Sequence, residues 1–406
     1  MPLPVPSLRL PAMRCLLPIL IAFALLVSTA SATPGLATQP GVTMAISPPE
    51  VTARSVYVVD MTSGVELYAK DPYAHLQVGS IVKIATALVV INNVGLDEQV
   101  VIQESDLVDV DEYSNMALVA GDTLTVRLLL YGLLIPSGND AARALARHVG
   151  AKLSGSEDAR IATEAFVKEM NAYAATLGLK DSRFTVPDGI DTPNSYSSAY
   201  DVTILARELM KNETLRSIVR EPAYRFVSVG PEARVYEKST TNNRLGQSAV
   251  VGVKTGTTLM AGGNVVLARE VNGGANTVLI TIIGAEHTYT TGNADTPDAR
   301  WTDADTIMSA MDASFTWTAP DADDVLPGLS EELAVWNLQF QDPPAIPIPT
   351  GGTAPLGYQL QVGAPADPGA RSGALYLYYG EDRVGSIPIF QAGEPAAWDP
   401  SKRIAA

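Results

Sequence analysis

Cysteine is almost absent from this chain of 406 residues, which contains a single one, Cys15, near its start. One thiol cannot close an internal disulfide, and it cannot supply the several thiolates of a structural zinc site. Because Cys15 lies in an apolar amino-terminal segment, a cysteine nucleophile is not expected in the remainder. A secreted domain of this size can build its core without disulfides, so their absence does not argue against export.

Histidine and positive charge are also scarce. The three histidines, His75, His148 and His287, are isolated and form no His-Glu-x-x-His pattern, so we expect neither a metal nor another cofactor. Acidic residues outnumber basic ones by 44 to 28, which gives a formal net charge of −16. Such a surface repels phosphate backbones, and nucleic acid is therefore not an expected partner.

The amino terminus has the pattern of a secretory signal peptide. Basic residues precede an apolar stretch, and small residues follow it: Arg9 and Arg14, then Cys15–Val27, then Ala30–Ala32. Cleavage would remove two arginines and no acid, which changes the formal charge from −16 to −18. The alternative is a retained anchor, which the short run and its internal Pro18 disfavour. The pattern predicts an exported protein, in the periplasm or on the cell-wall side of the membrane.

Composition along the chain predicts two folded parts. We expect a signal peptide over 1–32, a flexible leader over 33–50, a first domain over 51–318, a Pro-rich and acidic linker over 319–352 and a small β-rich module over 353–406. No amphipathic helix closes the sequence, so a carboxy-terminal membrane anchor is not expected. Mixed helices and antiparallel strands in the first domain indicate an α+β fold.

Apolar periodicity places the main elements of the first domain. It predicts a hairpin over 51–66 with a turn at Thr62-Ser63-Gly64. We expect helices over 80–93, 124–134, 140–149, 164–177, 200–211 and 302–315, and strands over 250–253, 264–270 and 277–283.

Three short strings occur in a fixed order: Ser80-Ile-Val-Lys83, Ser137-Gly-Asn139 and Lys254-Thr-Gly256. Each string alone fits an ordinary helix cap, turn or strand end at least as well as a site. The three together, behind a signal peptide, contain the groups that a serine acyl-transfer site with a lysine base requires.

The first string supplies a nucleophile and a base. Ser80 opens the expected helix, where outward-pointing N–H groups favour developing negative charge. Lys83 is three residues later and shares its face. A lysine accepts the serine proton only when neutral, and burial or a second cation such as Lys254 would lower its pKa.

The other two strings supply binding groups. The Ser137 hydroxyl could pass a proton to the leaving amine, and the Asn139 amide could hold a substrate carbonyl and orient Lys83. Lys254 lies on a predicted strand, whose edge can pair with an extended peptide. There Lys254, Thr255 and Thr257 would bind an anionic end, and Gly256 would allow close approach. The N–H groups of Ser80 and Thr257 could form an oxyanion hole.

With these residues, the chain resembles the D-alanyl-D-alanine carboxypeptidases, which are low-molecular-mass penicillin-binding proteins. The resemblance runs over roughly residues 50 to 318, through the segments Ser80–Leu88, Gly121–Val126, Leu128–Ala141, Met170–Ala172, Pro187–Ile190 and Gly252–Thr257. It implies a β-lactamase/transpeptidase-like catalytic domain over 51–318, an antiparallel sheet flanked by helices, followed by a small all-β domain.

The resemblance also implies an activity without a cofactor. The enzyme would trim the terminal D-alanine from peptidoglycan stem peptides through an acyl-enzyme on Ser80, and β-lactams would acylate the same serine. The family roles fall on Ser80 as nucleophile, Lys83 as general base, Ser137 as proton relay, Asn139 as positioning group, and Lys254, Thr255 and Thr257 as carboxylate ligands.

Some departures leave alternatives open. Val82 stands where the family usually has Thr, immediately before the base lysine. A β-lactamase-like hydrolase would need a glutamate to activate the deacylating water, and the sequence has no convincing Glu-x-x-x-Asn loop. A D,D-endopeptidase breaks the same kind of bond as a D,D-carboxypeptidase, and the sequence distinguishes the two poorly. A non-catalytic peptidoglycan-binding protein is the remaining alternative.

Overall fold

A computed structural model describes residues 49–230, 232–292, 296, 298–321, 325–350, 356–363 and 367–393. The expected signal peptide, nearly all of the expected leader and the last residues of the expected β-module lie outside this described part.

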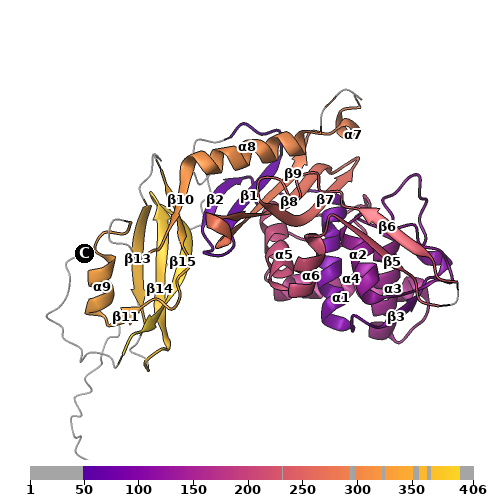
Figure 1. The fold of residues 1–406 in the computed structure, drawn as a ribbon, viewed down its shortest axis with the longest axis horizontal. Helices are drawn as coiled ribbons and strands as arrows, with labels where there is room; N and C mark the ends of the chain where they lie inside the picture. Colours follow the sequence, from indigo (N-terminus) through magenta and orange to yellow (C-terminus); the bar gives the residue numbers. More distant parts are fainter. Residues whose placement is uncertain are drawn as a thin grey trace, which may run out of the picture. The chain divides into compact units, whose positions relative to one another are not determined.

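The first domain is built on a five-stranded antiparallel sheet with the strand order β2-β1-β9-β8-β7 (Figure 1). Its strands are β1 (Ser55–Asp60), β2 (Glu66–Lys70), β7 (Val250–Thr258), β8 (Gly262–Val271) and β9 (Asn276–Ala285). The expected hairpin and the three expected strands are confirmed, and the three strands are longer than the apolar pattern indicated.

Helices cover both faces of this sheet. Below it in Figure 1 lie α1 (Lys83–Asn93), α2 (Val126–Leu134), α3 (Asn139–Ser154), α4 (Ala159–Thr176), α5 (Ala199–Lys211) and α6 (Glu213–Val219), and above it lies α8 (Ala299–Ser314). Side-chain caps start several of them, because Thr125, Asp158 and Ser198 accept hydrogen bonds from the backbone of α2, α4 and α5. The six expected helices are confirmed, with shifted ends.

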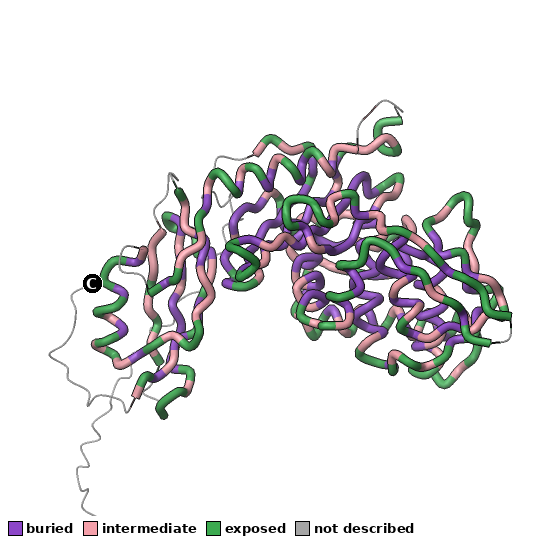
Figure 2. The backbone as a smooth tube through the Cα atoms, in the orientation of Figure 1, coloured by how far each residue is buried: buried purple, intermediate pink, exposed green. Residues whose placement is uncertain are grey.

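Strand alternation divides the buried side chains into two cores. On β8, Val266 and Ala268 pack with the helices into the α1–α6 core, which includes Ile84, Leu129 and Leu205. Val265 and Leu267 face the opposite side and join the α8 core, which includes Val58, Ile280, Ile307 and Met311. Figure 2 shows that the buried segments lie in the strands of the sheet and on the sides of the helices that face it.

Smaller antiparallel pairs border the helices. They are β3 (Gln99–Val101) with β4 (Thr123–Thr125), and β5 (Ala223–Val227) with β6 (Val235–Ser239). The helix expected from residue 124 therefore starts at Val126, after a short strand. A short helix, α7 (Thr288–Thr291), follows β9.

The second region contains the expected all-β fold. Its sheet has the order β11-β15-β14-β13, and the strands are β11 (Leu338–Gln339), β13 (Leu356–Val362), β14 (Arg371–Tyr379) and β15 (Asp382–Gln391). Leu375, Leu377 and Ile387 of this sheet belong to the α8 core.

The range expected to be a linker, 319–352, contains α9 (Leu329–Val335), β11 and β12 (Ile346–Pro349). β12 pairs with β10 (Phe315–Thr318), directly after α8. Its alternating Ile-Pro sequence suits a strand with a single partner, because proline cannot donate a ladder hydrogen bond. The range is therefore structured in part, while the expected domain boundaries stay a prediction.

Candidate active site

Ser80 and Lys83 lie where the chain enters α1. Ser80 is in the single 3-10 turn η1 (Gly79–Val82), and Lys83 is the first residue of α1. The Lys83 side chain is completely buried, and its Nζ donates to Ser80 Oγ at 2.8 Å. The expected nucleophile and base are thus in direct contact, and Val82 is buried in the α1–α6 core.

Lys83 Nζ has two further acceptors. They are Asn139 Oδ1 at 2.7 Å and the backbone carbonyl of Asp188. Three acceptors match the three protons of an ammonium group. If Lys83 loses a proton, its hydrogen bonds to Asn139 and Asp188 can remain. Its lone pair then faces Ser80 Oγ, which becomes the donor.

Burial makes this deprotonation accessible near neutral pH. Desolvation lowers the pKa of Lys83 from its usual 10.5 to about 8, with a smaller contribution from the positive charge of Arg143. The carboxylates of Asp188 and Asp140 act in the opposite direction and limit the decrease. A lysine with such a pKa can serve as a general base.

Ser137 lies just before α3 and lines the same cavity as Ser80. Its backbone φ is +66°, in the left-handed region that is uncommon for a residue with a side chain. Its Oγ is buried and has no hydrogen-bond partner among the described residues. Strain and an unsatisfied hydroxyl in the same residue are typical of a group held ready for a ligand.

Lys254 and Thr255 come from β7. The Lys254 side chain is fully buried, and Nζ donates to the Thr255 carbonyl at 2.8 Å. Desolvation lowers the pKa of Lys254 well below its usual value, and the charges of Lys83 and Arg300 lower it further. Thr255 Oγ1 lies 2.5 Å from the Thr241 hydroxyl.

Glycines allow β7 and a neighbouring loop to approach the nucleophile. A Cβ on Gly256 would lie 2.6 Å from the Val78 carbonyl, and one on Gly79 would lie 3.3 Å from the Thr257 amide nitrogen. A Cβ on Gly189 would lie 2.2 Å from the Gly79 carbonyl and 3.0 Å from the Ser80 nitrogen. The backbone of β7 therefore passes close to the turn that carries Ser80.

These elements line a solvent-open cavity of about 170 Å³. It is lined by Ser80, Ser114, Ser137, Thr241, Asn243, Thr255, Gly256, Thr257, Asp298, Arg300 and Trp301. Five of the eight expected site residues line it. The other three, Lys83, Asn139 and Lys254, are buried beside lining residues. The three strings of the sequence therefore meet at one cavity, and the individual catalytic roles stay predictions.

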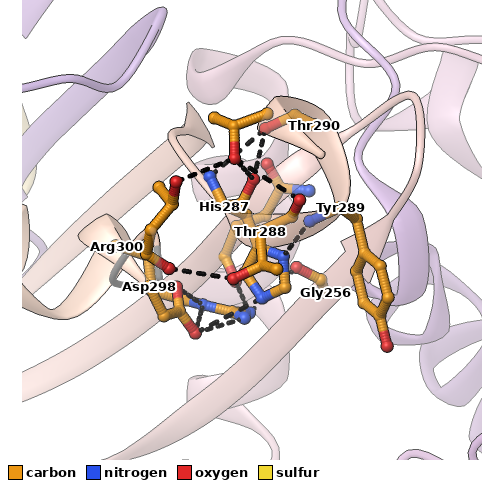
Figure 3. A network of polar contacts seen from close by, with 10 residues as sticks. Gly256, His287, Thr288, Tyr289, Thr290, Asp298 and Arg300 are labelled. Atoms are coloured by element: carbon orange, nitrogen blue, oxygen red, sulfur yellow. Dashed lines mark hydrogen bonds and ion pairs between the residues drawn. The ribbon is translucent and has the colours of Figure 1, made fainter. Parts of the chain in front are cut away.

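Arg300 is the main lining residue that the sequence analysis missed. Its Nη1 donates to the carbonyls of Gly256 and Asn264, and its Nε donates to the Asp298 carboxylate at 2.7 Å (Figure 3). His287 lies in the same network, with Nε2 3.7 Å from the Asp298 carboxylate. No motif surrounds Arg300 in the sequence. The only signal was an arginine two residues before the helix expected over 302–315.

The described residues contain neither a candidate metal-binding cluster nor a candidate membrane-spanning helix. No three His, Cys, Asp or Glu side chains lie close enough together there to hold a metal ion. None of the helices in the same part has the length and apolarity needed to cross a membrane.

Known proteins match both the sequence and the fold. A family model described as D-alanyl-D-alanine carboxypeptidase matches residues 42–286. The D-alanyl-D-alanine carboxypeptidase of Streptomyces sp. strain K15 is 38% identical over 220 residues, covering 52% of this chain and 74% of the relative. D-alanyl-D-alanine carboxypeptidase DacA of Haemophilus influenzae is 30% identical over 265 residues, covering 60% of each protein.

Solved structures agree. The Streptomyces K15 DD-transpeptidase matches with a TM-score of 0.58 and 34% identity, over 65% of this chain and 98% of that one. Penicillin binding protein 5 of Haemophilus influenzae matches with a TM-score of 0.65 and 23% identity, over 86% of this chain and 99% of that one. The latter supports the fold alone, and its coverage is more than residues 51–318 could supply, so the likeness extends into the β-rich region. The extent of the family match, together with the three strings at one cavity, leads to one conclusion: the chain belongs to the D-alanyl-D-alanine carboxypeptidase family.

Proposed function

We propose that this chain is a serine-type D-alanyl-D-alanine carboxypeptidase that removes the terminal D-alanine from peptidoglycan stem peptides. The observation that carries the proposal is the contact between Ser80 Oγ and the buried amine of Lys83, 2.8 Å apart at the edge of a polar cavity. A serine hydroxyl needs an adjacent base to become a nucleophile, and a lysine with a pKa of about 8 meets that need.

The chemistry follows from these positions. Ser80 Oγ attacks the carbonyl carbon of the penultimate D-alanine while Lys83 accepts its proton, and the N–H groups of Ser80 and Thr257 stabilise the oxyanion. The peptide C–N bond then breaks, and the Ser137 hydroxyl relays a proton to the amine of the departing D-alanine. Water finally cleaves the acyl-enzyme ester and regenerates Ser80.

The substrate carboxylate would bind at the other end of the cavity. Lys254, Thr255 and Thr257 supply one side, as the family resemblance implies. Arg300 adds a cation to the same wall, close to the Gly256 carbonyl. Asn139, held by Lys83 through its Oδ1, would orient the peptide by its amide.

The deciding experiment is mass spectrometry of the purified protein after incubation with benzylpenicillin, beside Ser80→Ala. We expect a stable adduct on Ser80 that is missing from the variant. Among the described residues that line the cavity, the only carboxylate is Asp298, which is paired with Arg300. This arrangement offers no free carboxylate to activate a deacylating water, so deacylation should be slow.

Other outcomes point to the alternatives. Released penicilloate with little adduct would favour a β-lactamase-like hydrolase. Absence of both adduct and hydrolysis would favour a non-catalytic peptidoglycan-binding protein and would reject the proposal.

A second candidate function is transpeptidation, since the solved Streptomyces K15 structure is that of a DD-transpeptidase. The two reactions share the acyl-enzyme and differ in whether water or an amine attacks it. A peptide ending in D-Ala-D-Ala, incubated with and without an amino-acid acceptor, separates them. Both reactions release D-alanine. If the shortened peptide acid is formed in the same amount with and without the acceptor, the carboxypeptidase is supported. A new amide between the shortened peptide and the acceptor supports the transpeptidase. A cross-linked dimeric muropeptide tests the D,D-endopeptidase alternative.

We further propose that the protein acts outside the cytoplasm, where peptidoglycan lies. Residues 51–318 would carry catalysis, and the β-rich region would be a separate module. Support for export is the signal-like pattern of residues 1–32. Sequencing the amino terminus of the secreted protein would test the expected cleavage after Ala32.

A further inference from the structure

An ion pair outside the three strings lies directly behind the expected base. Arg143, on the first turns of α3, donates from Nε to Asp188 Oδ2 at 3.2 Å and from Nη1 to the Leu107 carbonyl at 3.0 Å. The side chain of Asp188 is 3% exposed and that of Arg143 is 32% exposed. The carboxylate therefore has a nearly buried position with one cationic partner.

The backbone of Asp188 contacts the catalytic machinery. Its carbonyl accepts one of the three hydrogen bonds from Lys83 Nζ. The preceding carbonyl, of Pro187, accepts a 2.6 Å hydrogen bond from Thr86 of α1. The segment 187–188 is thus held between α1, through its carbonyls, and α3, through the Asp188 side chain.

We infer that the Arg143–Asp188 ion pair is a positioning device for Lys83: it holds the Asp188 carbonyl against Nζ and balances the charge that this amine faces. The inference rests on the proposed role of Lys83 as general base. Arg143 is four residues after Asn139 on α3, so one helix would set two of the three acceptors of Lys83, directly and through Asp188.

The charges around Lys83 come from two elements and one loop. α3 contributes Asp140 and Arg143, β7 contributes Lys254, and the loop before α5 contributes Asp188. Asp140 is already saturated by the backbone nitrogens of Met116, Leu118 and Ala141. Changing Asp140 would break these backbone hydrogen bonds, whereas Arg143 and Asp188 can be changed without breaking them.

The two partners act on Lys83 in opposite senses, which makes the inference testable. Asp188 favours protonated Lys83, and Arg143 disfavours it. Asp188→Asn should move the midpoint of the rising pH limb of penicillin acylation to lower pH. Arg143→Met should move it to higher pH. Each shift should be about half a unit to one unit, as expected for one charge near a buried site.

The variants are suited to this purpose. Asp188→Asn keeps the shape of the side chain. Arg143→Met removes a partly exposed guanidinium at a second cavity, of about 260 Å³, that water can fill. Arg143→Lys should return the midpoint to the wild-type value, and the double variant should lie near it because both charges are gone. Arg160→Met, at an exposed pair on α4, is the matched control and should change nothing.

The midpoint has to be measured in two ways. The first is the second-order rate constant of benzylpenicillin acylation between pH 6 and pH 10, by quenched mass spectrometry. The second is NMR titration of Lys83 in protein labelled at lysine, assigned with Lys83→Met. This second readout does not depend on activity, so a protein that is not acylated rejects the proposed function and still tests the ion pair.

Opposite shifts of the two single variants support the inference. Shifts in the same direction, or losses of rate with unmoved midpoints, would show that the pair is only structural and would overturn it. Thermal unfolding of each variant, measured alongside, separates a moved midpoint from a loss of folded protein.

Discussion

The active-site region and the α8 core treat buried polar groups in opposite ways. Beside the cavity, Lys83 and Lys254 are buried cations with lowered pKa values, and the Ser137 hydroxyl lacks a partner among the described residues. On the α8 side, the buried Asp60 carboxylate accepts four hydrogen bonds, from the Thr62 and Ser63 backbone and from Asn276 and Trp317.

We interpret the difference as one between groups that the proposed chemistry uses and groups that hold the structure together. A buried hydroxyl without a partner and a desolvated amine both cost stability, and such groups persist where a substrate or a proton transfer makes use of them. A fully bonded carboxylate such as Asp60 instead joins β1, β9 and β10 into one unit. Substitutions in the two regions should therefore affect activity and stability in opposite proportions.

Lys83→Met should give the largest loss of activity. Removing the general base should slow acylation by benzylpenicillin by about 10²- to 10⁴-fold. Because folding lowers the pKa of Lys83 from 10.5 to about 8, a charged Lys83 opposes folding, fully below pH 8 and progressively less as the pH rises towards 10.5. The melting temperature at pH 7 should therefore stay unchanged or rise. Quenched mass spectrometry and thermal unfolding measure the two effects, and acylation at the wild-type rate would contradict the assignment of the base.

Two glycines with positive φ make a matched pair. Gly189 (φ +81°) and Gly64 (φ +77°) should each cost about 1 kcal/mol in backbone strain when changed to alanine. At Gly189 the new methyl would also lie 2.2 Å from the Gly79 carbonyl, whereas at Gly64 it would meet nothing within 4 Å. Gly189→Ala should therefore displace Ser80 and reduce acylation about 10- to 100-fold.

Gly64→Ala is the control for strain alone. Urea unfolding should show a small loss of stability, with the acylation rate unchanged. Equal acylation rates in the two variants would mean that the close approach of Gly189 to η1, the turn that carries Ser80, does not affect acylation.

The pH dependence of the wild type should show the Lys83 titration. With a pKa of about 8, roughly a tenth of Lys83 is neutral at pH 7 and a hundredth at pH 6. The second-order rate of acylation should fall about tenfold between these values and reach a plateau above pH 9. A rate that stays flat from pH 6 to pH 9 would be inconsistent with a neutral lysine as base.

Asp60→Ala should have the smallest effect on activity and a clear effect on stability. It leaves the side chains of Asn276 and Trp317 without their acceptor, and we expect the free energy of unfolding to fall by about 3 kcal/mol. Acylation per folded molecule should be unchanged, since Asp60 lies outside the cavity. Asp97→Ala, at a side chain that is 92% exposed, is the control and should leave the unfolding midpoint in urea where it is.

Sequence patterns were most informative where they were long or regular. The apolar helix of α1 and the alternation on β8 could be predicted because one face of each is buried. α6 and the β5–β6 hairpin were not predicted. The seven residues of α6 are few for a periodic signal, and β5 and β6 each bury only one side chain fully, Tyr224 and Tyr236.

The order of the three strings, the serine and lysine three residues apart at a helix start, and the scarcity of cysteine and histidine were sufficient to predict a serine site with a lysine base. These features depend on residue type and local spacing, which the chain carries at every stage of folding. Burial of Lys83, the left-handed backbone of Ser137, the closeness of Arg300 to Gly256 and the Arg143–Asp188 pair depend on segments that lie far apart in the sequence. Packing brought them together, because a pKa and a hydrogen-bond partner are set by neighbours in space and not by neighbours along the chain.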